Sequence, residues 1–276
     1  MHRYLLFDLD GTLTDPAEGI TKCVQYALSY FGQAERRPEE LYCYIGPPLP
    51  ESFETYGGLS REEALLAVEK YRERFREKGM FENKVYPGVE KLLWTLRDAG
   101  RVLAVATSKP EVFAKEILGH FGLSEYFQEI VGSELDGTRM DKAEVIRSLQ
   151  AEGHTVAMLG DGINDSPALS AADVGVTLSD GADLAREVAD VVLTECRLDG
   201  LVTAVDLSKA AMRRIRTDFG LIMTLNTVFL ASGLAGFLQP GPSALLHNLT
   251  TVGVSLNAMR PMLKAGAEPQ LEEVSA

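Results

Sequence analysis

The sequence predicts an α/β fold in which a doubly wound parallel sheet is covered by helices on both faces. Three mainly apolar segments lack the polar alternation of half-exposed strands, and they lie at residues 3–7, 102–106 and 155–159. Shorter strands are expected at residues 129–131, 174–176 and 191–193. Helix-prone segments separate these strands, and this alternation is typical of a parallel sheet with helices packed on each side.

Helices and turns divide the chain into a core, an insert and a C-terminal extension. Helices are expected at residues 16–32, 89–98 and 143–150. The segment 35–79 is charged and helix-prone, and it is broken by Gly46-Pro47-Pro48 and by Gly57-Gly58. We therefore expect a core made of residues 1–14 and 81–200, a helical insert at residues 15–80, and an extension at residues 201–276.

Composition limits the class of protein. The chain has 276 residues and a formal net charge of −13. A chain of this length can bury a full core, and its acidic balance argues against a general nucleic-acid-binding protein. Cys23, Cys43 and Cys196 are widely spaced and form no CxxC pair, so we expect reduced thiols in a cytosolic compartment. Acidic residues follow Phe7 at once, so the N-terminus does not resemble a signal peptide.

The most informative motif is Asp8-Leu9-Asp10-Gly11-Thr12, directly after the first predicted strand. Strand alternation places the carboxylates of Asp8 and Asp10 on the same side, and Gly11 permits a sharp turn or the close approach of a ligand. Like charges this close need a cation, a proton or a chemical role. A carboxylate pair at Mg²⁺, with one member attacking phosphorus, satisfies these conditions; a solvated turn after an edge strand is the alternative.

Polar residues also follow the two other long strands. Thr107-Ser108-Lys109-Pro110 follows the strand at 102–106, and Gly160-Asp161-Gly162-Ile163-Asn164-Asp165 follows the strand at 155–159. Because ligands bind beyond the carboxyl ends of parallel strands, we expect these segments at one edge of the sheet, and Lys142 could bring an ammonium group there. Taken singly, Thr107 or Ser108 could be a helix cap and Lys142 a surface lysine.

As a set, these segments resemble the four motifs of the haloacid dehalogenase superfamily over residues 1 to about 200. The motifs are DLDGT at Asp8, Thr107, Lys142, and GDGIND at Gly160–Asp165. Other segments resemble the phosphoglycolate-phosphatase-like branch, and they are residues 106–110, 132–137 and 44–49. The resemblance implies a Rossmann-like core, with the insert at 15–80 forming a helical cap over the active site.

The resemblance also implies roles for individual residues. Asp8 would attack phosphorus, and Asp10 would act as general acid and then as general base. Mg²⁺ would be held by Asp8, the main-chain carbonyl of Asp10, and Asp161, with Asp165 nearby or acting through water. Phosphate oxygens would contact Thr107, its neighbour Ser108, and Lys142. In the cap, residues near Gly46 would face the substrate and supply specificity.

The end of this region resembles a different branch of the same superfamily. Residues 160–193 resemble the end of the phosphorylation domain of heavy-metal-transporting P-type ATPases, and residues up to 261 resemble the last two membrane helices of those pumps. The pumps carry threonine where this chain has Asp10, so their aspartyl-phosphate persists. With Asp10 present, the intermediate should hydrolyse quickly. The chain also lacks room for the other pump domains, so transport is not expected.

The extension contains a long uncharged stretch. No Asp, Glu, Lys or Arg occurs between Phe219 and Met259, and basic residues lie on both sides of it. Residues 219–238 could form a helix of about 30 Å, which is long enough to cross a membrane. Residues 242–259 are barely long enough for this and are more polar. Between them, Gln239–Pro242 signals a turn. We expect a transmembrane hairpin with both basic flanks on the cytoplasmic side, followed by an acidic tail. A helix pair packed on the core or on a partner subunit, in a soluble cytoplasmic protein, is the alternative.

The sequence therefore predicts a Mg²⁺-dependent phosphatase that acts on a small phosphorylated substrate and is tethered to the cytoplasmic face of the membrane. Phosphoglycolate is the leading substrate by resemblance, and nucleoside monophosphates stay open. A membrane-bound accessory protein with a vestigial phosphatase site is a further alternative, although the complete motif set argues against it. The sequence leaves the oligomeric state undetermined.

Overall fold

The computed structural model describes residues 3–135, 141–194, 198 and 200–262. The chain divides into two compact units at Gly200. In the first unit, six strands form the main sheet, and they are β1 (Arg3–Phe7), β4 (Val102–Pro110), β5 (Glu129–Ser133), β6 (Thr155–Leu159), β7 (Val174–Leu178) and β8 (Val191–Leu193). The expected strands are all present, and β4, β5 and β7 extend further than their apolar segments.

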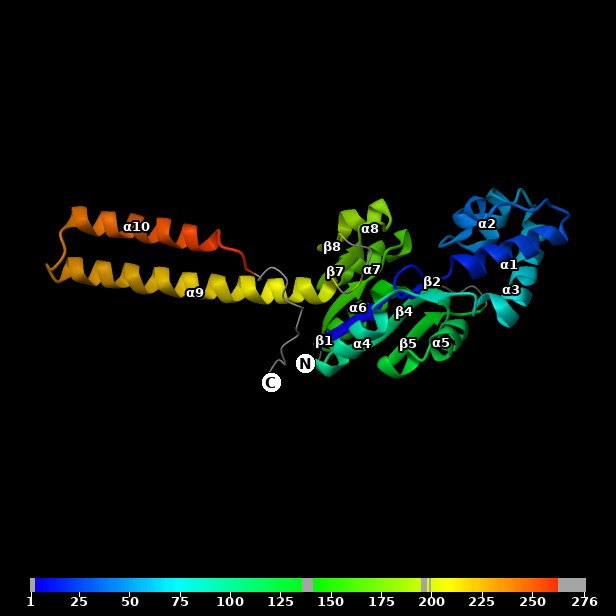
Figure 1. Cartoon of the computed structure of the whole chain (residues 1–276), viewed down its shortest axis with the longest axis horizontal. Helices are drawn as coiled ribbons and strands as arrows, with labels where there is room; N and C mark the ends of the chain where they lie inside the picture. Colours follow the sequence, from blue (N-terminus) through cyan, green and yellow to red (C-terminus); the bar gives the residue numbers. More distant parts are fainter. Residues whose placement is uncertain (1–2, 136–140, 195–197, 199, 263–276) are drawn as a thin grey trace. The chain divides into compact units, whose positions relative to one another are not determined.

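The main sheet is parallel throughout, in the order β5-β4-β1-β6-β7-β8. The predicted doubly wound sheet is therefore confirmed. Because β1 lies between β4 and β6, the strand order reverses beside it (Figure 1). The carboxyl end of β1 is thus the switch point at which open α/β sheets bind their ligands.

Helices cover both faces of this sheet. Around it lie α4 (Val89–Asp98), α5 (Glu111–His120), η3 (Ser124–Tyr126), α6 (Lys142–Ala151), η4 (Ile163–Asp165), α7 (Ser166–Ala171) and α8 (Asp183–Val188). Leu6 belongs to a buried cluster with Ile146 of α6 and Ala168 of α7. Its neighbour Phe7 packs against Phe127, with ring centroids 6.1 Å apart. Alternating side chains of β1 therefore enter two apolar layers, and burial of each large side chain contributes about 1.5–3 kcal/mol.

The insert forms a separate helical layer, which we call the cap. Its elements are α1 (Ala17–Tyr30), η1 (Pro38–Tyr44), α2 (Leu49–Thr55), α3 (Arg61–Arg74) and the π-helical turn η2 (Phe75–Gly79). A capping box between Ser60 and Glu63 begins α3. The short antiparallel pair β2 (Thr14–Asp15) and β3 (Lys84–Val85) joins the cap to the core. Of the predicted boundaries of the cap, residue 15 ends β2, whereas residue 80 directly follows η2 and precedes β3 by four residues.

A bulge ends the regular pairing of β4 with β5. Ala106 pairs with Val131 and Pro110 with Ser133, so three residues of β4 face Gly132 alone. A Cβ at Gly132 would lie only 2.6 Å from the Lys109 carbonyl oxygen, so glycine permits this close approach. Bulges redirect side chains at the ends of strands. Here the redirected residues are Thr107, Ser108 and Lys109.

The second unit is a pair of antiparallel helices, α9 (Gly200–Leu234) and α10 (Pro240–Ala258) (Figure 1). The predicted linker helix and first hairpin helix are one continuous helix of 35 residues. The predicted turn at 239–242 lies slightly earlier, because Gly236 adopts φ 79° and Pro240 begins α10. Proline suits the first position of a helix, and glycine suits a left-handed turn. Among the described residues, α9 alone is long and apolar enough to cross a membrane.

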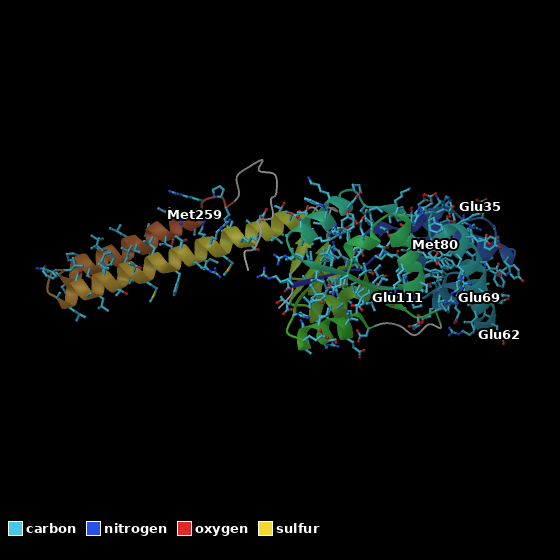
Figure 2. All side chains as sticks on the ribbon, turned by 90° about the horizontal axis from the view of Figure 1, so that it is seen from below. Glu35, Glu62, Glu69, Met80, Glu111 and Met259 are labelled. Atoms are coloured by element: carbon cyan, nitrogen blue, oxygen red, sulfur yellow. The ribbon has the colours of Figure 1, made fainter. Side chains whose placement is uncertain are left out.

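Polar groups of this hairpin pair with each other. His247 Nδ1 lies 2.8 Å from Asn226 Oδ1, and Asn257 Nδ2 donates to Asp218 Oδ1 at 2.9 Å. Hydroxyl groups donate to carbonyls four residues earlier in their own helix, and they belong to Thr227, Thr250, Thr251 and Ser255. Large apolar side chains point outward along both helices (Figure 2). The hairpin thus has a polar seam and an apolar exterior.

Candidate active site

The Asp8–Thr12 motif forms a tight loop at the carboxyl end of β1. The Asp8 N–H donates to the Leu159 carbonyl of β6 at 2.9 Å, which extends the sheet pairing to the first carboxylate. The Leu9 N–H donates to Asp8 Oδ1 at 2.8 Å. Gly11 adopts φ 82°, and a Cβ there would overlap the carboxylate of Asp161. Glycine is therefore required both by the backbone conformation and by the neighbouring carboxylate.

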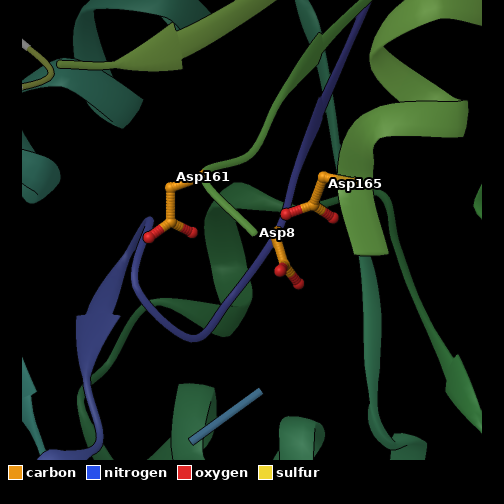
Figure 3. A group of neighbouring side chains, drawn as sticks. All are labelled: Asp8, Asp161 and Asp165. Atoms are coloured by element: carbon orange, nitrogen blue, oxygen red, sulfur yellow. The ribbon is translucent and has the colours of Figure 1, made fainter. Parts of the chain in front are cut away.

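Three carboxylates meet at this point, and they belong to Asp8, Asp161 and Asp165 (Figure 3). One oxygen from each lies within 4.8 Å of the others. Asp161 follows β6 and accepts a hydrogen bond from Thr12 Oγ1 at 3.3 Å. Asp165 ends η4, is fully buried, and accepts from the Gly162 N–H at 2.9 Å. Hard oxygen donors that converge in this way fit Mg²⁺.

Lys142 supplies a buried positive charge to this group. It is the first residue of α6, and its ammonium group lies 2.9 Å from Asp8 Oδ1 and 2.5 Å from Asp165 Oδ1. The preceding Asp141 caps α6 by accepting from the Ala143 N–H at 2.8 Å. Burial alone would lower the pKa of Lys142, but Asp8 and Asp165 raise it, so the ammonium stays charged.

Burial and the neighbouring negative charges raise the pKa values of three carboxyl groups in the site, those of Asp161, Asp165 and Asp10. Burial, with the charge of Asp8 second, raises the pKa of Asp161 to about 6. The same two causes raise the pKa of Asp165, while Lys142 opposes them. Burial also raises the pKa of Asp10, and Lys109 opposes that shift. A cation bound among Asp8, Asp161 and Asp165 would remove this cost, which is a second reason why the site fits a divalent metal.

Thr107 and Ser108 lie on the bulge of β4. The hydroxyl oxygen of Thr107 is buried and accepts from the Lys109 N–H at 3.2 Å. Ser108 is exposed, and its hydroxyl oxygen accepts from Asn164 Nδ2 at 3.2 Å. Asn164 belongs to the loop that carries Asp161 and Asp165, so this contact joins the second and fourth motifs.

Asp10 differs from the other carboxylates because its partner is a second lysine. Lys109 Nζ lies 2.8 Å from Asp10 Oδ2. The other oxygen, Oδ1, is buried and has no hydrogen-bond partner in the described part of the chain. The carboxylate of Asp10 therefore does not join the cluster of three, although we expect its main-chain carbonyl among the metal ligands.

Gly46 lies in the cap between η1 and α2. It adopts φ 99°, and a Cβ there would meet no atom within 4 Å. Its expected contact with substrate stays a prediction. The cap meets the core elsewhere, where Phe75 of η2 packs edge-on against Phe113 of α5 with ring centroids 5.3 Å apart.

Three contacts of the site go beyond the roles predicted from the sequence. They are those of Lys109 with Asp10, Thr12 with Asp161, and Asn164 with Ser108. Each of these residues lies inside a recognised motif, so its proximity to the site is visible in the sequence. Which atom each side chain contacts depends on the β4 bulge and on the loop after β6, and neither has a signature in the sequence.

Comparison with known proteins identifies the family. The sequence model of the haloacid dehalogenase-like hydrolases matches residues 5–178, which include every carboxylate of the site. The chain belongs to the haloacid dehalogenase-like hydrolase family. Within it, a predicted phosphatase from Clostridium acetobutylicum is 43% identical in sequence and has a similar structure, with a TM-score of 0.62 over 70% of this chain and 94% of that chain.

Two further relatives are proteins of different kinds. A 5'-nucleotidase from Pseudomonas aeruginosa is 50% identical over 165 residues, which make up 58% of this chain and 75% of the relative. A zinc-exporting P-type ATPase from Mycobacterium marinum is 38% identical over 181 residues, or 64% of this chain. This match covers only 24% of the pump. The two likenesses agree with the mixed resemblance seen in the sequence.

Proposed function

We propose that this protein is a Mg²⁺-dependent phosphatase that hydrolyses a small phosphomonoester through an aspartyl-phosphate on Asp8. The observation that carries the proposal is the convergence of Asp8, Asp161 and Asp165 within 4.8 Å, with Lys142 against two of them. Aspartate can act as a nucleophile only if its charge is held in place and the incoming phosphate is not repelled. The buried ammonium of Lys142 supports both requirements.

The reaction has two steps. A carboxylate oxygen of Asp8 forms a bond to phosphorus while the bond to the alcohol oxygen breaks, and Asp10 donates a proton to that oxygen. Asp10 then takes a proton from water, the water oxygen bonds to phosphorus, and the bond to Asp8 breaks to release phosphate. Asp10 is suited to both steps because burial, opposed by Lys109, raises its pKa, so that it keeps its proton to a higher pH than an exposed aspartate does.

The phosphate would be held by Thr107, Ser108 and Lys142. Hydroxyl and ammonium donors fixed at this point stabilise the charge that develops on the phosphoryl oxygens. Mg²⁺ bound by Asp8, Asp161, Asp165 and the Asp10 carbonyl would offset the negative charge of the site. The fit of this ion rests on the raised pKa values of Asp161 and Asp165 and on the oxygen-only donor set.

Phosphoglycolate is the first candidate substrate, on the motif resemblance of residues 44–49 and 106–110. A nucleoside 5'-monophosphate is the second, and it is favoured by the 50% identity to a 5'-nucleotidase. We expect the cap to decide between them, because the resemblance implies that it covers the site, with residues near Gly46 facing the substrate. The two substrates differ most in size, so the cap should separate them strongly.

A substrate comparison tests this function. Purified full-length protein with Mg²⁺ is assayed for phosphate release from 2-phosphoglycolate and from nucleoside 5'-monophosphates, beside Asp8→Asn and the exposed control Asp98→Asn. We expect turnover by the wild type and by the control, and none by Asp8→Asn. Equal release by the wild type and Asp8→Asn would favour an accessory protein with a vestigial site.

We also propose that α9 and α10 attach the enzyme to the cytoplasmic face of a membrane. The polar seam supports this, because α10 carries polar side chains that would be costly in lipid unless they were paired. Pairing of His247 with Asn226 and of Asn257 with Asp218 removes much of that cost. The uncharged helical arms are about 24 Å and 29 Å long at 1.5 Å per residue, close to the hydrocarbon thickness of a bilayer.

The ends of the hairpin support the same orientation. Arg214 donates to the carbonyls of Ala258 and Pro261, at 3.3 Å and 3.1 Å, and so fixes the end of α10 beside α9. Basic residues at positions 209–216 and 260 lie at this same end of the hairpin. Basic flanks of membrane helices favour the cytoplasmic side, which is where Mg²⁺ and phosphorylated metabolites are available.

Fractionation of cells that express the full chain tests this attachment. We expect the protein in the membrane pellet after an alkaline wash, with release by detergent. A variant with Val228→Lys and Leu249→Lys, at two outward apolar positions, should move to the soluble fraction. Recovery of the wild type as a monodisperse soluble monomer without detergent would overturn the membrane proposal.

A further inference from the structure

The two oxygens of Asp10 have different surroundings. Oδ2 lies 2.8 Å from the ammonium of Lys109, whose side chain is only 8% exposed. Oδ1 is buried and has no hydrogen-bond partner among the residues described. A buried carboxylate oxygen without a partner is costly, so this arrangement persists because the surrounding structure imposes it. Lys109 is the group that holds the carboxylate in this orientation.

The backbone fixes Lys109 in turn. It lies on the β4 bulge, where Gly132 allows close approach of the chains, and its N–H donates to the Thr107 hydroxyl at 3.2 Å. The side chain of Lys109 extends from the bulge, and β4 pairs with β5 both before and after the bulge. Its ammonium therefore reaches Asp10 from a rigid element of the core.

The cap supplies the third contact of Lys109. Its ammonium lies 4.9 Å from the centroid of the Phe75 ring, on the π-helical turn η2. Phe75 is itself fixed by stacking on Tyr71, at 5.4 Å, and by its contact with Phe113. A cation over an aromatic face is attracted to the ring, and the attraction is stronger when the pair is shielded from water. The lysine thus lies between a carboxylate of the core and an aromatic ring of the cap.

We propose that Lys109 is a positioning residue: it binds Oδ2 of Asp10 and so leaves Oδ1 for proton transfer to the leaving oxygen, and Phe75 of the cap keeps it there. This inference rests on the proposed phosphatase function. It gives the cap a second task besides covering the site, because a displaced cap would withdraw Phe75 from Lys109. Proton transfer would then be efficient only with the cap seated.

The leaving group provides the decisive test. An alkyl alcohol leaves poorly without a proton from Asp10, whereas p-nitrophenolate leaves without one. The value of kcat/KM covers only the steps up to release of the alcohol, so it isolates this proton transfer from later hydrolysis. The full-length enzyme is assayed with an alkyl phosphate, the better substrate of those compared above, and with p-nitrophenyl phosphate.

We expect Lys109→Met to lower kcat/KM about 10- to 100-fold for the alkyl phosphate and less than about 3-fold for p-nitrophenyl phosphate. Lys109→Arg, which keeps the charge, should recover part of the loss. Phe75→Leu should show the same selectivity with a smaller loss, and its effect should largely vanish when Lys109 is already Met. Lys115→Met, at an exposed lysine that pairs with Glu111, is the matched control and should change neither value.

Equal losses on both substrates would show that Lys109 binds the phosphate or supports the fold, and would overturn the proposal while leaving the phosphatase function intact. No loss on either substrate would also overturn it. If Lys109→Met proves unstable by thermal unfolding, Lys109→Arg and Phe75→Leu carry the same comparison. A wild-type enzyme inactive on both substrates would instead overturn the phosphatase function itself.

Discussion

Lys142 Nζ lies 2.9 Å from Asp8 Oδ1, although the two residues belong to α6 and to the loop after β1. The same ammonium reaches Asp165, so one buried cation is shared by two carboxylates. The three charged side chains stabilise the fold only together, because removal of the Lys142 ammonium would leave the buried negative charges of Asp8 and Asp165 without a partner. This dependence links the stability of the core to the chemistry of the site.

Replacement of Lys142 by methionine should therefore destabilise the protein. We expect a loss of about 3 kcal/mol or more in the free energy of unfolding near pH 8, because Asp8 and Asp165 lose their partner. The loss should be smaller near pH 5.5, since burial raises the pKa of Asp165 and protonation relieves the repulsion. Urea unfolding of the wild type and the variant at the two pH values measures the two losses in unfolding free energy, and Lys115→Met is the control. A loss independent of pH would contradict this explanation.

The raised pKa of Asp161 predicts how metal binding depends on pH. With a folded-state pKa of about 6 against a usual 3.8, the folded protein binds more protons than the unfolded chain between about pH 4 and pH 6. The contribution of this group to metal-free stability therefore falls as the pH rises through that window. Mg²⁺ competes with the proton, so the rise in melting temperature on adding Mg²⁺ should be larger near pH 8 than near pH 5.

Asp161→Asn should abolish most of that Mg²⁺-induced rise, whereas Asp98→Asn, at an exposed position outside the site, should keep it. Thermal unfolding with and without Mg²⁺ gives the answer without an activity assay. A rise of the same size at both pH values would mean that the ion binds somewhere other than this cluster.

Asp10→Asn should separate the two chemical steps. With p-nitrophenyl phosphate, transfer to Asp8 needs no proton from residue 10, but hydrolysis of the intermediate still needs a base. Phosphorylated Asp8 should therefore accumulate, while steady-state turnover falls by about 10²- to 10⁴-fold. Mass spectrometry of rapidly acid-quenched protein locates the modification. Phosphate on a different residue would contradict the assignment of Asp8 as nucleophile.

Gly132→Ala should disturb the site from outside it. The added Cβ would lie 2.6 Å from the Lys109 carbonyl oxygen and 2.7 Å from backbone atoms of Glu111, so the β4 bulge must shift. We expect a cost of about 1–3 kcal/mol and a clear fall in kcat. Gly119→Ala, on the exposed side of neighbouring α5 with only the Ser124 hydroxyl at 3.8 Å, should be neutral or stabilising. Similar results for the two variants would argue against a special role of the bulge.

The polar seam of the hairpin predicts coupling between Asn226 and His247. If only one of the two residues is changed to leucine, the polar side chain of the other loses its hydrogen-bond partner. If both are changed, no polar side chain is left without a partner at this place. A double-mutant cycle of unfolding in detergent micelles should give a coupling of about 0.6–2 kcal/mol. Additive losses would show that the two helices do not meet at these positions in the membrane.

The sequence by itself determined the sheet, the four motifs and the uncharged extension. Continuous apolar strands separated by helices favour a parallel sheet covered on both faces, and such a sheet brings Asp8, Thr107 and Asp161 to one edge whatever the details of packing. The absence of Asp, Glu, Lys and Arg from residues 219–259 likewise sets the apolar character of that part of the hairpin.

Only the tertiary structure decided which atoms meet. The bulge in β4 aims Lys109 at Asp10, and its close approach to Gly132 depends on β5, which is distant in sequence. The seam between α9 and α10 depends on how far the chain turns at Gly236, which shifts the register of every facing pair. Hydrogen bonds and ion pairs form over a few ångströms, so they depend on long-range packing that local sequence patterns do not specify.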